Sequence, residues 1–236
     1  MKIALCFSGQ PRSVEKTFPL IKKNILDSNN PDVFIHSWID QNIKQHIPIA
    51  ASGAPASDTI PENIEELILD LYKPTKYIFE PQIEFNEKNY ASNKAIFIRP
   101  KSSISQLYSI FKSIELAKDY DIIIRMRLDW GIQTLIDVSN LDLNKISAPN
   151  DCPHAGGIND QFAIGTNSSM KIYSELYDKF DEYFTNDNIS FCNEILLGHH
   201  LRKNSIEVNL IPISYEIIRH STDAHKRFNE NYIKYI

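Results

Sequence analysis

The residues of this chain best suited to chemistry lie in the segment 119–130, DYDIIIRMRLDW, where an isoleucine-rich run ends in two arginines and an aspartate. Side chains alternate along a strand, so Arg125, Arg127 and Asp129 would share one face while the apolar side chains take the other. Charged groups are costly to bury unless they pair with one another or meet a charged ligand. The segment therefore predicts either a binding site for a charged ligand or an ion-pair network that only joins two layers of the fold.

A second candidate site, SGQPR at residues 8–12, directly follows the first apolar run of the chain. Ligands bind beyond the carboxyl ends of strands in open α/β sheets, and a cation at a helix entrance favours phosphate or a nucleotide there. A single glycine is no phosphate-binding fingerprint, so a plain turn stays an equal alternative. The candidate binding residues of this segment are Ser8, Gly9, Gln10 and Arg12.

A third candidate site is GGINDQFAIG, residues 156–165, which places amides and a carboxylate immediately before an apolar run. Asn159, Asp160 and Gln161 offer both donors and acceptors, as sugar hydroxyls require, and Asp160 is also suited to act as a base. The alternative is an Asx-type turn that leads into a strand.

Further candidates come from the C-terminal third of the chain. Glu194 lies in a mostly apolar helical segment, where it is either a reserve base or an exposed or ion-paired carboxylate. His199 and His200 are adjacent and point in different directions on a helix, so they do not form a metal pair. His220, near the end of a late strand, is a better candidate ligand, although a lone histidine is more often structural.

The elements that must position these residues follow from apolar periodicity and from turn residues. Apolar runs predict strands near residues 2–7, 32–38, 77–81, 119–130, 145–149 and 160–165, and helical periodicity predicts helices near residues 18–26, 64–71, 103–120, 167–180 and 190–203. This alternation predicts an α/β fold with a mostly parallel central sheet flanked by helices, organised as a single domain over residues 1–236. The small residues at 50–59 predict a mobile loop that closes over bound donor or acceptor.

Composition limits the function classes. The chain has 236 residues, 42% hydrophobic residues and a net charge of −5, which indicates a globular protein with no general affinity for nucleic acid. Three widely spaced cysteines form no disulfide framework, and no apolar stretch reaches the roughly 20 residues that span a bilayer. We therefore expect a reducing, cytoplasmic location with at most peripheral membrane association.

With RMRLD, NDQFAIG and NEILLGHHL in view, the chain resembles the short glycosyltransferases of bacterial capsule, O-antigen and other surface-polysaccharide gene clusters, over residues 2 to about 201. Each motif is loose, but their order and spacing together are moderately specific. The resemblance implies a GT-A-like fold, a nucleotide-sugar donor, and an acceptor that is a glycan or a sugar lipid.

The resemblance also implies a role for Asp129, which would occupy the place of the metal-binding acid that ends a strand in such enzymes. The sequence departs from the common pair of acids separated by one residue, because Arg127 stands where the first acid would be. A divalent cation, Mn²⁺ or Mg²⁺, would then be held by Asp129, by the donor diphosphate and by His220. In the alternative, Arg12, Arg125 and Arg127 neutralise the diphosphate without a metal.

The sequence thus favours an enzyme that transfers a sugar from a nucleotide-diphosphate donor to a hydroxyl of a surface-glycan or lipid-linked acceptor. The arginines and Asp129 would stabilise the leaving diphosphate, Asn159 and Gln161 would help to hold the donor, and Asp160 would be the base, with Glu194 in reserve. The rivals are a sugar-phosphate or nucleotidyl transferase and a non-catalytic carbohydrate-binding protein.

Overall fold

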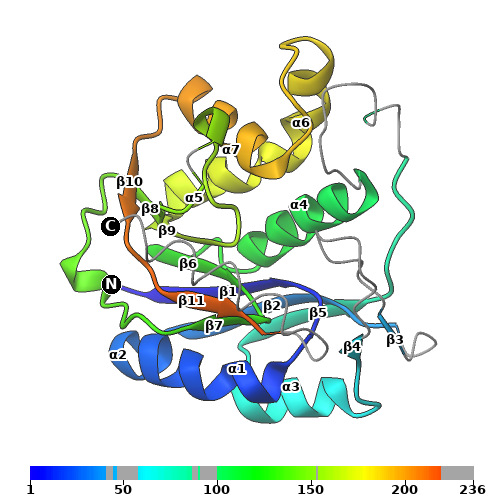
Figure 1. The fold of residues 1–236 in the computed structure, drawn as a ribbon. Helices are drawn as coiled ribbons and strands as arrows, with labels where there is room; N and C mark the ends of the chain where they lie inside the picture. The colour runs from blue at the N-terminus through cyan, green and yellow to red at the C-terminus, as the bar shows by residue number, and fades with distance from the viewer. Residues whose placement is uncertain (41–44, 47–57, 87–89, 91–99, 153, 219–236) are drawn as a thin grey trace, which may run out of the picture.

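The computed structural model describes residues 1–40, 45–46, 58–86, 90, 100–152 and 154–218 (Figure 1). Its central feature is a seven-stranded sheet with the strand order β10-β8-β9-β6-β1-β2-β5. The strands of this sheet are β1 (Ile3–Gly9), β2 (Asp32–Trp38), β5 (Lys76–Glu80), β6 (Ile122–Arg127), β8 (Ile146–Pro149), β9 (Phe162–Thr166) and β10 (Val208–Ile211). Strand β9 runs antiparallel to its neighbours β6 and β8, whereas the other pairings in this sheet are parallel.

Helices cover both faces of the sheet (Figure 1). One face carries α1 (Val14–Ile21), the π-helical turn η1 (Lys22–Leu26), α2 (Asp27–Asn29) and α3 (Ile64–Tyr72), and the other carries α4 (Pro100–Glu115), α5 (Asn167–Ser174), α6 (Leu176–Thr185) and α7 (Asn193–Lys203). The described part also contains the 3-10 turns η2 (Val138–Asn140) and η3 (His154–Gly156). Two short antiparallel pairs lie outside the main sheet: β3 (Gln45–His46) with β4 (Asp58–Thr59), and β7 (Trp130–Ile132) with β11 (Tyr215–Ile217).

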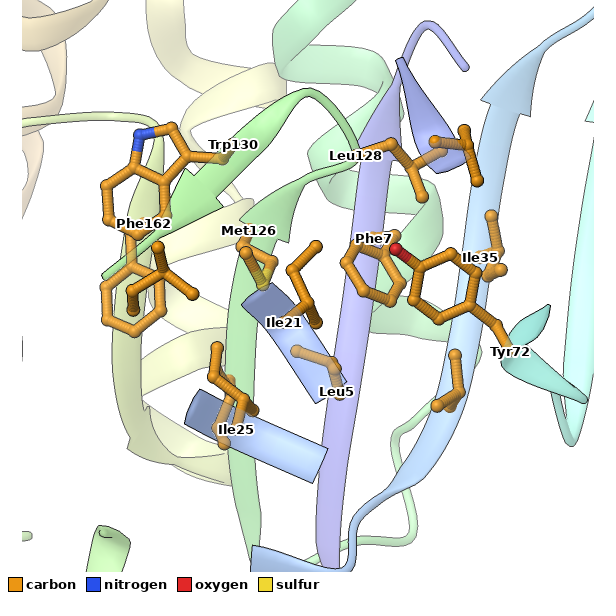
Figure 2. Packing of buried hydrophobic residues seen from close by; sticks show 14 of the residues in the cluster. Leu5, Phe7, Ile21, Ile25, Ile35, Tyr72, Met126, Leu128, Trp130 and Phe162 are labelled. Carbon is orange, nitrogen blue, oxygen red and sulfur yellow. The ribbon is translucent and has the colours of Figure 1, made fainter. Parts of the chain in front are cut away.

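The strand alternation divides the buried apolar residues into two cores. In β1, Leu5 and Phe7 face α1 and α3, where Phe7 packs against Tyr72 with ring centroids 4.7 Å apart (Figure 2). Ala4 and Cys6 face the other way and join the core beneath α4 and α5. Burial on both faces of the sheet explains why the central strands are nearly continuous apolar runs.

The predicted α/β fold with a mostly parallel sheet and flanking helices is confirmed. The single helix expected over residues 167–180 is wrong, because it ends at Ser174 and a second helix begins at Leu176. The Ser174 hydroxyl donates to the Lys171 carbonyl at 2.8 Å, a local bond that competes with regular helix bonding. The short strands β7 and β10 were not expected, and residues 50–57 of the predicted loop lie outside the described part.

The strand that carries the arginines ends earlier than expected. It stops at Arg127, and Asp129 lies in the turn that follows. The Thr17 hydroxyl donates to the Leu128 carbonyl at 2.7 Å, so a side chain from α1 takes the place of a neighbouring strand there. Within the described residues, no helix is long and apolar enough to cross a membrane.

Candidate functional site

The three sequence segments meet at one edge of the sheet. Strands β1 and β6 are parallel, with Ser8 opposite Arg127, so both end at the same edge. Strand β9 is antiparallel, with Phe162 opposite Met126, and therefore begins at that edge. Asp160 lies two residues before β9, and its backbone carbonyl accepts a hydrogen bond from Arg125 of β6. The predicted grouping of SGQPR, RMRLD and NDQ follows from this topology.

Arg125 connects the three segments by hydrogen bonds. Its side chain is completely buried, and its Nε and Nη2 atoms donate to the Ser8 hydroxyl at 3.1 and 2.9 Å. Its Nη1 atom donates to the backbone carbonyl of Asp160. Burial lowers the pKa of Arg125, but a guanidinium remains charged in proteins. Arg125 is thus a buried cation that fixes the ends of β1 and β6 against the start of β9.

Arg127 and Asp129 form a bidentate ion pair. Arg127 donates from Nε to Asp129 Oδ1 at 2.7 Å and from Nη2 to Oδ2 at 2.6 Å. Arg12 approaches from the start of α1, with Nη1 4.0 Å from Oδ2. Burial acts to lower the pKa of Arg127, but the charge and hydrogen bonds of Asp129 and the charge of Asp160 together outweigh it, so the pKa is raised. The Asp129 side chain is only 3% exposed, whereas that of Arg127 is 19% exposed.

Asp129 is poorly placed to be a metal ligand in this arrangement. Mg²⁺ lies about 2.1 Å from its oxygen ligands, so a cation on Asp129 would lie within about 5 Å of Arg127, whose nitrogens are 2.6 and 2.7 Å from those oxygens. At that distance and an effective dielectric constant of about 20, a divalent cation and a guanidinium repel by about 7 kcal/mol. Arg12 would add to this repulsion.

The other predicted metal ligand, His220, lies outside the described residues. Among the residues that the structure does describe, no group of three or more His, Cys, Asp or Glu side chains could hold a metal ion. Because both carboxylate oxygens of Asp129 already accept from Arg127, the described residues do not fit the divalent cation that the resemblance implies, and we derive no step through one.

Asp160 is a buried carboxyl group at the centre of the site. Its side chain is 5% exposed, and its Oδ2 atom accepts a hydrogen bond of 2.7 Å from Gln106 of α4. It adjoins a cavity of about 10 Å³, which has room for about one water molecule and lies on the side of the core beneath α4 and α5. The cavity is lined by Leu107, Ile110, Asp160, Tyr173, Ser174, Leu176 and Leu197.

This environment changes the proton affinity of Asp160. Burial and the nearby Glu194 charge raise its pKa to about 7, against the opposing effects of Arg125 and Arg127. An effective general base has a pKa near the working pH, and a pKa of about 7 meets that condition, but the low exposure of Asp160 restricts access. The raised pKa is equally the mark of a carboxyl group that is simply buried.

Glu194 lies near Asp160, in the first turn of α7. Its side chain is half-buried, and its Oε2 atom accepts from the Cys192 thiol at 2.9 Å. Its backbone carbonyl accepts from the Ile158 amide at 3.0 Å, which ties α7 to the segment that leads into β9. Burial and the Glu194 charge raise the pKa of Cys192 to about 12, so this cysteine stays a thiol.

Asn159 and Gln161 are held by a network that the sequence did not indicate. Asn159 Nδ2 donates to Asp151 Oδ1 at 2.8 Å and to the Tyr215 hydroxyl at 3.2 Å. Asn159 Oδ1 accepts from the Gln161 amide at 2.8 Å, which is the hydrogen bond of an Asx-type turn. The turn that was the alternative reading is therefore present, and it fixes Asp160 between two anchored amide residues.

Two amide oxygens at the same edge are buried with no hydrogen-bond partner among the described residues, Oε1 of Gln10 and Oε1 of Gln161. Buried polar atoms in native proteins are nearly always paired, so each needs an explanation. Both belong to segments that the sequence assigned to binding. Each atom lies out of contact with solvent, so a ligand would reach it only after neighbouring side chains move.

Gly9 ends β1 with no side chain, which leaves space beside the backbone there. Its φ of +108° suits glycine, and a Cβ atom there would meet no described atom within 4 Å. Its amide donates to the Ser109 hydroxyl at 2.7 Å, and Ser109 lies 2.8 Å from Nδ1 of the buried His36. His36 Nε2 in turn lies 2.8 Å from Glu80 Oε1. Burial lowers the pKa of His36, so the neutral ring can accept from Ser109 and donate to Glu80.

Sequence reasoning missed this chain of hydrogen bonds, although a signal was present. Ser105, Ser109 and Ser113 recur every four residues on α4 and are all buried. Buried serines at helical spacing indicate a helix face that packs closely on a sheet and needs polar partners there.

No protein-family model and no curated protein matches this chain. The functional assignment therefore depends on the site itself and on the motif resemblance.

Proposed function

We propose that this chain is a GT-A-like glycosyltransferase that moves a sugar from a nucleotide-diphosphate donor to a hydroxyl of a surface-glycan or lipid-linked acceptor. One observation carries the proposal: three segments that are about 110 and 30 residues apart in sequence meet at one sheet edge, joined by the hydrogen bonds of Arg125 to Ser8 and to the Asp160 carbonyl. The mostly parallel sheet, with its charged residues beyond the strand ends, supports a nucleotide-binding fold of this type.

The donor diphosphate would lie over Gly9 and beside Arg127. A departing nucleoside diphosphate needs positive charge where its own negative charge develops. Arg127 is the more exposed partner of the ion pair with Asp129, and Arg12 lies next to it at the entrance to α1. Arg125 is completely buried, so we assign it to positioning Ser8 and Asp160. The unpaired oxygens of Gln10 and Gln161 would accept from hydroxyl groups of the donor only if neighbouring side chains move on binding.

The acceptor hydroxyl needs a proton acceptor, and the pair of Asp160 and Glu194 supplies one. Asp160 is the first choice because its pKa is raised to about 7 by burial and by Glu194. Glu194 is half-buried and therefore easier to reach, so it is the reserve. A retaining reaction would not require a base in this place.

The acceptor class and the location come from the motif resemblance. Enzymes of that kind work in the cytoplasm, where nucleotide sugars are made, and a lipid-linked acceptor would bring this chain to the membrane as a peripheral protein.

A donor-turnover assay tests the proposal. The purified chain is incubated with a panel of UDP-, GDP-, CDP- and dTDP-sugars, with and without sugar or sugar-lipid acceptors, and the nucleotide product is identified. Release of a nucleoside diphosphate supports a glycosyltransferase, whereas release of pyrophosphate from a nucleoside triphosphate indicates a nucleotidyl transferase. Binding of a glycan with no consumption of any donor would indicate a carbohydrate-binding protein instead.

Arg127→Met is the informative variant in this assay, and Lys171→Met is its matched control. Lys171 also loses one positive charge, but it lies on α5 with its side chain 73% exposed. We expect Arg127→Met to lose most of the turnover and Lys171→Met to retain it.

A further inference from the structure

We propose that donor binding at this site needs no divalent cation, because Arg127 supplies the positive charge and Asp129 acts as the positioning residue that holds Arg127 in place. This inference rests on the proposed function. It assigns Asp129 a role different from the metal ligand that the motif resemblance implies.

The geometry of the ion pair between Arg127 and Asp129 is the first observation that supports this inference. Both carboxylate oxygens of Asp129 already accept charged hydrogen bonds from Arg127, at 2.7 and 2.6 Å. A fork of two parallel bonds fixes the plane of the guanidinium as well as its position. Such a bond pattern is what a positioning residue provides, since it fixes the cation before any ligand arrives.

The hydrogen-bonding capacity of Arg127 is the second observation that supports this inference. A guanidinium has five N–H groups, and the fork to Asp129 uses Nε–H and one N–H of Nη2. The Arg127 side chain keeps 19% exposure while that of Asp129 keeps 3%. An incoming anion would therefore meet the arginine and not the carboxylate.

The charged side chains around Arg127 are the third observation that supports this inference. Arg12, Arg125 and Arg127 gather at the edge where Asp129 is the near carboxylate partner of two of them. The carboxyl groups of Asp160 and Glu194 also lie at this site, so the charge that meets an anion is that of the more exposed Arg127 and not the summed charge of the three arginines. A nucleoside diphosphate, with two adjacent phosphates, is a ligand of matching charge and of a shape that guanidinium groups recognise.

The test measures nucleoside diphosphate binding by calorimetry on the full chain, in excess EDTA and in excess Mn²⁺. The nucleotide is whichever of UDP, GDP, CDP and dTDP gives the largest thermal shift. We expect the two dissociation constants to differ by less than about threefold. Asp129→Asn should weaken binding by about 10- to 100-fold, the size of a hydrogen bond to a charged group, and equally in both buffers.

Two further variants separate positioning from general damage. Arg127→Lys keeps the charge but cannot form the fork, so it should bind nearly as weakly as Asp129→Asn. Lys171→Met, an exposed charge removed elsewhere, should bind like the wild type. If Asp129→Asn bound as tightly as the wild type in EDTA, the positioning role would be wrong.

Comparison of the wild-type protein in EDTA and in Mn²⁺ gives distinct outcomes. None of them depends on whether a variant folds. Tight binding only in Mn²⁺ would overturn the inference and leave the proposed function standing. No binding of any nucleoside diphosphate in either buffer would reject both.

Discussion

Replacing the buried carboxyl group of Asp160 should change how the stability of the protein depends on pH. Burial and the Glu194 charge raise the pKa of Asp160 from 3.8 to about 7. In the unfolded chain this group has an ordinary pKa, so between those two values the folded state binds a proton that the unfolded state does not. The stabilising effect of this proton is fully present below pH 3.8 and is lost as the pH rises to about 7.

The size of the effect follows from the two pKa values. Between pH 5 and pH 8, ionisation of Asp160 should reduce the free energy of unfolding by about 2–3 kcal/mol. Asp160→Asn preserves the shape of the side chain and an oxygen for Gln106, but it carries no titrating group. The variant should therefore gain about 2–3 kcal/mol relative to the wild type over this pH range, equivalent to about 5–10 °C in melting temperature.

Urea denaturation of the two proteins at pH 5, 6, 7 and 8 measures this directly. Titrating groups that do not interact with Asp160 affect both proteins alike, so the difference between the two curves reports Asp160 and its coupling to Glu194. Curves that run parallel from pH 5 to pH 8 would refute the argument, because they would show that Asp160 titrates alike in the folded and unfolded states. The same variant should lower turnover by about two to four orders of magnitude if Asp160 is the base.

Three further substitutions test other parts of the site. Arg125→Met should cost about 3–5 kcal/mol in urea denaturation, since the buried guanidinium bonds two segments, and a cost below about 1 kcal/mol would contradict its bridging role. Ser109→Ala should cost about 1–3 kcal/mol by removing the partner of the Gly9 amide and of His36, and unchanged stability would show that water replaces the hydroxyl. Gly198→Ala should cost about 1–3 kcal/mol by thermal denaturation, because its Cβ would clash with the backbone oxygen of Gly156; a wild-type melting temperature would mean that α7 can shift.

The sequence was informative where physical periodicity decides the structure. The two-residue period of a strand places Ile124 and Met126 in one core and Arg125 toward the other, as the structure has them. Alternating strands and helices predicted a mostly parallel sheet, and a parallel sheet brings the ends of β1 and β6 to one edge. These features are local, so a single sequence contains them.

The sequence was uninformative where a distant partner decides the structure. Asp129 leaves the strand because Thr17, 111 residues away, bonds the Leu128 carbonyl. The proton affinity of Asp160 depends on burial and on the charge of Glu194, which lies on another helix. Such pairings depend on tertiary packing, which no local pattern in one chain reveals.

The chain of hydrogen bonds behind Gly9 is a similar case. It links residues of β1, β2, α4 and β5, and its members Ser109 and His36 are 73 residues apart. The serine spacing on α4 indicated a close helix–sheet contact, but not which strand residues it would meet.

A crystal structure of the chain with a bound nucleoside diphosphate would test the central claim most directly, namely that the three segments form a nucleotide-sugar site. The account predicts that the diphosphate lies at the edge formed by the ends of β1 and β6, with a phosphate oxygen within about 3 Å of an Arg127 or Arg12 nitrogen. A nucleotide seated elsewhere, with the fork between Arg127 and Asp129 facing away from it, would contradict the account.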